Sequence, residues 1–130
     1  MKLGDEGMKE ADVYDFLGWI LCAKFKGREI IEEQIRNSTF TIDEREYYAF
    51  VMFEKVKDGT KFPYRVRVPV DMLIYENGTI VPIVFMLHVM EGWIHELEIF
   101  RADSSELNLK GLKDLDIRKI EYVVDEYEET

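Results

Sequence analysis

The segment Phe85-Met-Leu-His-Val-Met-Glu-Gly-Trp-Ile-His-Glu-Leu-Glu-Ile-Phe100 decides the fold, because it holds two apolar runs on either side of a turn dipeptide. β-Branched and aromatic residues are frequent in both runs, as is typical of strands. The dipeptide Glu91-Gly92 is short enough to join the runs as a β-hairpin. This hairpin is expected to place the only two histidines of the chain, His88 and His95, opposite each other.

The rest of the chain after Phe40 has a similar strand-like composition. Turn dipeptides separate its apolar runs at short intervals, which predicts a mostly antiparallel sheet. Asn77-Gly78 is the strongest hairpin turn, since both residues tolerate the positive φ that a type I′ turn requires. The predicted strands are Glu46–Val56, Tyr64–Glu76, Thr79–Met90, Trp93–Arg101 and Arg118–Val124.

The two turns predict which residues face each other, because a two-residue loop sets the register of its hairpin. Counting from the Asn-Gly turn pairs Arg67 with His88, and counting from the Glu-Gly turn pairs His88 with His95. Pro69 then falls on a non-hydrogen-bonded pair with Met86, which tolerates its missing N–H. On its other side, Pro69 should weaken pairing toward the predicted strand 46–56. We therefore expect Arg67, His88 and His95 to form one row across three strands.

Two amphipathic helices are predicted ahead of the sheet. Residues 11–25 carry apolar side chains at the spacing of one buried helix face, and residues 28–36 repeat this pattern among glutamates. We predict an α+β fold, with two N-terminal helices packed on one face of an antiparallel, meander-type sheet of about four to six strands. As a single domain, residues 1–130 divide into an N-terminal tail (1–7), a helical part (8–37), the sheet (38–124) and an acidic tail (125–130).

Alternate side chains of a strand point to opposite faces, so the predicted register divides the sheet into two faces. The apolar face, which the helices are expected to cover, contains Val66, Val68, Val70, Met72, Ile74, Val81, Ile83, Phe85, Leu87, Val89, Ile94 and Phe100. Glu96 and Glu98 share this face, where a carboxylate needs a rim position or a partner because an unpaired buried charge is costly. The mixed second face contains Arg65, Arg67, Asp71, Met86, His88, Met90, Trp93, His95, Leu97 and Arg101.

Seven residues of the second face form the candidate binding face: Arg65, Arg67, Met86, His88, Met90, Trp93 and His95. In a first interpretation its histidines are partly buried amphipathic residues that hydrogen-bond to backbone, water or Asp71. In a second, Trp93 with the methionines and arginines forms a protein-recognition patch, since these residue types are enriched where partners dock. In a third, His88 and His95 share a metal ion or act in catalysis, with Glu91 or Asp71 as oxygen donors and a neighbouring arginine opposing the cation.

The charge of the chain restricts its partners. There are 17 basic and 27 acidic residues, which gives a net charge of −10. This charge argues against binding to nucleic acid or to an anionic membrane, because both depend on Lys and Arg. A basic or neutral protein partner is the better expectation.

The sequence predicts a cytoplasmic protein. Its N-terminus lacks the basic and apolar regions of a secretory signal, and no run of about 18 apolar residues is present that could cross a membrane. Cys22 is the only cysteine, so no internal disulfide can form. Because Cys22 lies in an apolar stretch, we expect a buried structural thiol.

Catalytic motifs are absent from the sequence. It contains no phosphate-cradling glycine loop, no paired cysteines and no nucleophile elbow. The Glu96 and Glu98 pair, two residues apart on one strand, is more typical of a salt-bridged edge than of a catalytic acid and base. We therefore assign no catalytic residue and no metal or cofactor ligand from motifs, and the sequence favours a protein without enzymatic activity.

Several short motifs resemble those of a family of small uncharacterised bacterial domains. They are Phe25-Lys-Gly27, Gln34, Arg67-Val-Pro-Val70, Leu87-His-Val89 with Glu91-Gly92, and Glu96-Leu-Glu-Ile-Phe-Arg-Ala-Asp103. The pattern F-x-G, Q, R-V-P-V, L-H-V-x-x-G and E-L-E-I-[YF]-x-A-D spans residues 25–105. The resemblance implies membership of this family, which carries no assigned activity.

Two functional hypotheses follow. The first is a small acidic cytoplasmic binding protein without enzymatic activity, of the inhibitor or immunity type, that uses the candidate binding face to hold a protein partner. The alternative is a protein that binds a small ligand, an anion or a metal ion on the face formed by Arg67, His88 and His95.

Overall fold

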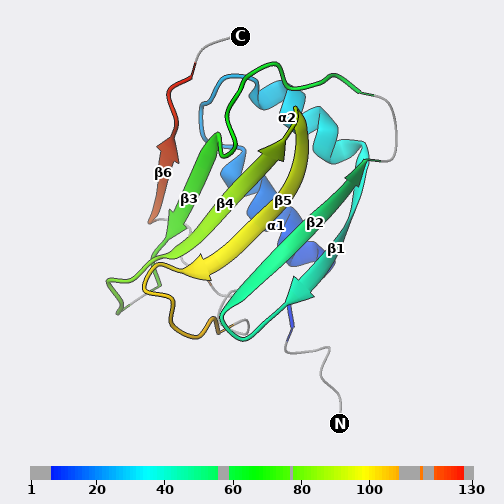
Figure 1. Ribbon diagram of the computed structural model, residues 1–130. Coiled ribbons are helices and arrows are strands. Elements are labelled where there is room, and N and C mark those ends of the chain that lie inside the picture. The colour runs from blue at the N-terminus through cyan, green and yellow to red at the C-terminus, as the bar shows by residue number, and fades with distance from the viewer. Residues whose placement is uncertain (1–6, 56–58, 77, 109–114, 116–118, 128–130) are drawn as a thin grey trace.

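The structure, a computed structural model, describes residues 7–55, 59–76, 78–108, 115 and 119–127. It confirms the predicted α+β class and the antiparallel sheet. The helices are α1 (Glu10–Ile20) and α2 (Arg28–Arg36). The strands are β1 (Ser38–Glu44), β2 (Tyr48–Lys55), β3 (Val70–Ile74), β4 (Ile83–Met90), β5 (Trp93–Arg101) and β6 (Ile120–Val124), which lie side by side in the order β1-β2-β5-β4-β3-β6 (Figure 1).

Helix α1 forms where the apolar spacing predicts it. Its buried residues recur every three or four positions and are Val13, Phe16, Leu17 and Ile20. The helix ends at Ile20, five residues before the predicted end at Phe25. The reason is a tighter last turn, in which the N–H groups of Cys22 and Ala23 bind carbonyls three residues earlier.

Helix α2 has the predicted bounds, and it begins directly after Gly27. The φ of Gly27 is 82°, in the left-handed region that favours glycine. A Cβ atom at this position would also overlap the ring of Phe62. Gly27 therefore fixes both the start of α2 and the close approach of the loop that contains Phe62.

The sheet is not one continuous meander, because β2 lies beside β5 and not beside β3. The expected pairing of Pro69 and its neighbours with the strand at residues 46–56 is therefore wrong. β3 begins only at Val70. Pro69 directly precedes it and cannot donate an N–H to a ladder, so the regular strand begins after this residue.

The chain turns near Gly78 as predicted, but the predicted two-residue hairpin is wrong, since β3 ends at Ile74 and β4 begins only at Ile83. The φ of Gly78 is 81°, and the N–H of Thr79 donates to the carbonyl of Glu76 at 3.3 Å. Asn77, the other residue of the predicted turn dipeptide, lies outside the described residues. A turn at this position agrees with the positive φ that the sequence predicts for the glycine.

The register of β3 against β4 differs from the prediction by two residues. Asp71, and not Pro69, pairs with Met86. Because the shift is an even number, every side chain of β3 keeps its predicted face. The predicted pairing of Arg67 with His88 is wrong, since Arg67 precedes the strand.

The turn between β4 and β5 forms at Glu91-Gly92 as predicted. The two residues have φ values of 54° and 89°, as a type I′ turn requires. A Cβ atom at Gly92 would overlap the side chain of Lys61 and lie 3.0 Å from the carbonyl oxygen of Phe62. Glycine is therefore required for the turn and for the approach of the neighbouring loop.

The core lies between the sheet and the helices. The ring of Phe16 in α1 packs against Phe85 of β4, with 4.9 Å between ring centroids. The hydroxyl of Tyr122 in β6 donates to the carbonyl of Trp19 in α1 at 2.6 Å, which ties the last strand to the first helix. The buried side chains of the strands are Ala49, Val51, Phe53, Val70, Met72, Ile74, Ile83, Phe85, Leu87, Val89, Ile94, Leu97 and Ile99.

Gln34 of α2 is the only buried polar side chain among the described residues, with 3% exposure. Its Nε2 donates to the carbonyls of Thr60 and Gly92 at 2.9 and 3.0 Å, and its Oε1 accepts the N–H of Ile94 at 2.8 Å. β2 pairs with β5 only as far as Glu96, so Gln34 supplies the partner that a strand would otherwise give to Ile94. One side chain thus joins α2, the 59–62 loop and the start of β5.

Tyr127 packs against the connection between the two helices. Its hydroxyl donates to the carbonyl of Lys26 at 2.6 Å, and the Lys26 Nζ donates to the carbonyl of Tyr127 at 3.1 Å. Burial, with Tyr64 and Asp125 nearby, raises the pKa of Tyr127 to about 12. Residues 128–130 of the predicted acidic tail lie outside the described residues.

Cys22 is exposed, so its predicted burial is wrong. It follows α1 directly on the solvent side, where its Sγ lies 3.4 Å from the carbonyl of Gly18. Within the described part of the chain, no helix has the length and apolar character needed to cross a membrane.

Candidate functional site

The face of the sheet opposite α1 carries a mixture of apolar and acidic side chains. We call it the helix-free face, because none of the described helices lies on it (Figure 1). Its apolar side chains are Tyr48, Phe50, Met52, Leu73, Val84, Met86, Phe100 and Val123, and its carboxylates are Asp43, Glu54, Asp71, Glu96, Glu98 and Glu121. The exposed fractions of Tyr48, Met52 and Val123 are 41%, 38% and 52%.

A β-bulge in β5 decides which side chains share the helix-free face. The ladder between β4 and β5 shifts by one residue between His88 and Val89: Val89 pairs with Ile94 and His88 pairs with Glu96, so His95 is an extra residue in β5. An extra residue reverses the alternation of every later side chain in the strand. Glu96 and Glu98 therefore point away from the core. Leu97 and Ile99, which follow them, point into it.

Because of this bulge, several predictions from the sequence are wrong. His88 does not face His95, and Glu96 and Glu98 do not share the core face. Burial of two carboxylates would cost far more than one disrupted pair in the ladder, so the bulged register is the stable one. The bulge also exchanges the predicted faces of Leu97, Phe100 and Arg101.

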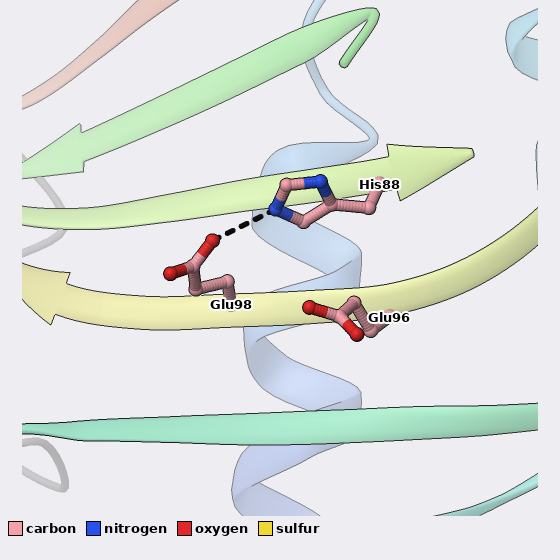
Figure 2. A group of neighbouring side chains, drawn as sticks. All are labelled: His88, Glu96 and Glu98. Atoms are coloured by element: carbon pink, nitrogen blue, oxygen red, sulfur yellow. Dashed lines mark hydrogen bonds and ion pairs between the residues drawn. The ribbon is translucent and has the colours of Figure 1, made fainter. Parts of the chain in front are cut away.

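His88, Glu96 and Glu98 form one cluster on the two central strands (Figure 2). Nε2 of His88 lies 2.8 Å from Oε1 of Glu98, and one ligand atom from each of the three side chains lies within 4.8 Å of the others. The side chains of His88 and Glu98 are 12% and 28% exposed. One imidazole and two carboxylates, partly shielded from water, could hold a divalent ion or exchange a proton.

Two polar atoms beside this cluster are buried and have no hydrogen-bond partner among the described residues: Oδ1 of Asp71 and Nδ1 of His88. Burial raises the pKa of the Asp71 carboxyl and the nearby Asp125 raises it further, whereas His88 lowers it. A buried polar atom without a partner destabilises a fold. This part of the face is therefore not arranged for stability alone.

Replacement of Asp71 with Asn should raise the midpoint of thermal unfolding at pH 7. The carboxyl has a higher pKa in the folded state than in the unfolded state, so its charged form costs stability above the folded pKa. Below the unfolded value of about 4 both states are protonated and the cost disappears. Thermal unfolding followed by circular dichroism at several pH values should show the gain of Asp71→Asn shrinking as the pH falls. An equal gain at all pH values would exclude charge as its cause.

A groove of about 960 Å³ opens at the end of the sheet where β4 turns into β5. Residues 61–67 form one side of it, and the turn residues form the other. Lys61, Arg65 and Arg67 contribute positive charge, and Met90 and Trp93 contribute apolar surface. None of the three cations has an ion-pair partner within the described ranges. Glu91 also lines the groove, but the three cations outnumber it, so the groove is suited to a carboxylate or phosphate group.

The structure divides the predicted candidate binding face into three places. Met86 and His88 lie on the helix-free face. His95 lies in the bulge, where its Nε2 is 3.3 Å from Oε1 of Glu96. The remaining predicted residues line the groove and are Arg65, Arg67, Met90 and Trp93. The predicted row of Arg67, His88 and His95 is therefore not formed.

Sequence reasoning did not assign Glu96 and Glu98 to the candidate binding face, although the sequence contains a signal. The apolar residues Ile94, Leu97 and Ile99 are separated by three positions and then by two. A regular strand keeps a period of two, so the longer interval indicates a bulge. Asp71 lies on the same face as His88, as predicted, because the observed register of β3 differs from the predicted one by an even number of residues.

Comparisons with protein-family models, with curated proteins and with solved structures found no match to this chain. The resemblance to a family of small bacterial domains therefore stays a prediction. The function has to be inferred from the geometry of the helix-free face and the groove.

Proposed function

We propose that this protein is a binding module without enzymatic activity, which docks a second protein on its helix-free face. One observation supports this above all others: a sheet face without a described helix carries eight apolar side chains, three of them more than a third exposed. Two of these three, Tyr48 and Met52, form a continuous apolar patch with Phe50 and Phe100 on β2 and β5, whereas Val123 lies on β6, four strands from β2. Contiguous exposed apolar surface on a small protein commonly marks a site of protein interaction.

The charge of the helix-free face favours a partner with a basic surface. Six carboxylates lie on this face, and among the described strand residues that point to it only His88 is basic. The chain as a whole has a net charge of −10. Complementary charge speeds the encounter of two proteins and excludes partners of like charge. These features suit an inhibitor or immunity protein that covers a basic surface.

The helix-free face also has the layout of a docking surface. Phe50 of β2 lies opposite Glu98, Phe100 of β5 lies opposite Tyr48, and both phenylalanines are partly buried; the ring of Tyr48 packs 5.2 Å from Phe50. Interfaces commonly have an aromatic and apolar centre with a polar rim. A partner would therefore cover the aromatic residues and contact the carboxylates around them.

A photo-crosslinking amino acid at Met52 should capture the partner in the producing cell, whereas the same amino acid at Tyr14 should not. Met52 is exposed on the helix-free face, and Tyr14 is exposed on α1. The captured protein should have a basic surface and bind the purified chain directly. Met52→Glu should weaken that binding at least about tenfold, and added salt should weaken it too. Calorimetry with the two purified proteins measures both effects.

The matched control for this experiment is Ala11→Glu, which adds the same charge at an exposed position of α1. It should bind the partner as well as the wild type. Equal loss of binding in Met52→Glu and Ala11→Glu would place the interaction elsewhere. Crosslinks only between copies of this chain, with a dimer in sedimentation experiments, would replace the proposed partner with self-association.

A further inference from the structure

We propose that His88, Glu96 and Glu98 bind a divalent transition-metal ion, and that Asp71 orients His88 when the ion is bound. The three ligand atoms already lie within 4.8 Å of one another. Donors around a tetrahedral zinc ion at about 2.1 Å stand about 3.4 Å apart. Rotation of the glutamate side chains can bring the ligand atoms from within 4.8 Å to this spacing, since the backbone already places all three residues on one face.

The β-bulge is what makes this ligand set. In a hairpin without the bulge, the two glutamates would point into the core, away from His88. Bulges are frequent beside functional sites because they re-aim side chains. His95, the extra residue, also lies 3.3 Å from Glu96 and can hold that carboxylate in place. Ligand carboxylates commonly have such a neighbour.

Nδ1 of His88 and Oδ1 of Asp71, the two buried atoms that have no hydrogen-bond partner in the described part of the chain, complete this site. Nε2 of His88 faces Glu98, and Figure 2 shows the other ring nitrogen on the opposite side of the ring, toward β3, the strand that carries Asp71. When Nε2 binds a metal ion, the proton of the neutral imidazole resides on Nδ1 and needs an acceptor. Metal-binding histidines usually donate this N–H to a carboxylate, and Asp71 offers one.

The donor set selects the kind of ion. One neutral imidazole and two carboxylates present two negative charges, which a divalent cation neutralises. Zinc and other first-row ions accept mixed nitrogen and oxygen ligands, whereas magnesium and calcium prefer oxygen ligands alone. Three protein ligands also leave a coordination position for water or for a group of another molecule.

Titration of the tag-free full chain with zinc, in competition with a fluorescent chelator, tests the proposal. We expect one zinc ion per chain and no comparable binding of magnesium. Glu96→Gln and Glu98→Gln should each weaken zinc binding more than about tenfold, since each removes a charged ligand. Glu54→Gln, which removes an exposed carboxylate of the same face, should change it less than about twofold.

Asp71→Asn separates a role in metal binding from a role in folding. It should weaken zinc binding about tenfold, as loss of a partner of a ligand typically does, while the metal-free variant remains at least as stable as the wild type. Unchanged zinc affinity in Asp71→Asn would overturn the role of Asp71. Wild-type affinity in Glu98→Gln, or equal losses in Glu98→Gln and Glu54→Gln, would overturn the site. Because no partner protein is present, a negative result leaves the docking proposal intact.

Discussion

We expect the protein to keep its fold when His95 is deleted and to lose it when Glu98 is deleted. His95 is the extra residue of the bulge, so its removal leaves a regular hairpin in which all later side chains keep their faces. Deletion of Glu98 makes Leu97 and Ile99 adjacent, and adjacent residues of a strand cannot both point into the core. The strand must then bury Glu96 or expose Ile99. Either change costs several kcal/mol, a large part of the roughly 5–15 kcal/mol that stabilises a domain of this size.

Urea unfolding monitored by circular dichroism measures this difference. The variant without His95 should unfold in one cooperative transition, within about 1 kcal/mol of the wild type. The variant without Glu98 should show no such transition. His95→Ala serves as a control, since it keeps the bulge and changes only an exposed side chain. Comparable loss of stability in both deletion variants would show that His95 is not the extra residue of the bulge.

Gln34→Leu should destabilise the protein by about 3 kcal/mol and lower the thermal midpoint by roughly 10 °C. Leucine fills a similar volume but binds neither the N–H of Ile94 nor the carbonyl of Thr60. The carbonyl of Gly92 keeps one partner, the N–H of Phe62 at 2.8 Å. The cost therefore comes mainly from two backbone groups without partners, at about 1–3 kcal/mol for each that stays buried.

The matched control for Gln34→Leu is Glu33→Ala, at the preceding position of the same helix. Glu33 contacts the N–H of Thr60 only at 3.5 Å and at an exposed site, so its loss should cost less than about 0.5 kcal/mol. Calorimetric unfolding of both variants gives the comparison. Similar stabilities of the two variants would mean that water replaces the Gln34 amide without cost.

Local features of the fold could be predicted from the sequence. Helix α2 and strand β5 have the predicted bounds, because each is bordered by a glycine whose positive φ ends the preceding segment. Strand β3 is shorter than predicted, although Pro69 within the predicted strand indicated weak pairing. Helices and strands whose ends are set by neighbouring residues could thus mostly be predicted.

Long-range features could not be predicted in the same way. No local pattern indicates that β2 pairs with β5, because that choice depends on how the whole core packs. Strand β1 (Ser38–Glu44) was not among the predicted strands, since it follows α2 without a turn dipeptide. Gln34 is part of the pattern that resembles the family of small bacterial domains, but its three hydrogen bonds depend on contacts up to 60 residues away.

Strand β6 is the last of the six to be synthesised, yet it pairs along the whole of β3. While the ribosome still holds residues 120–124, one edge of β3 has no neighbour and the Tyr122 hydroxyl cannot reach Trp19. An unpaired edge next to an incomplete core is a common site of misassembly in a nascent chain. The sheet therefore gains its sixth strand, and β3 its second neighbour, only after residues 120–124 have emerged from the ribosome.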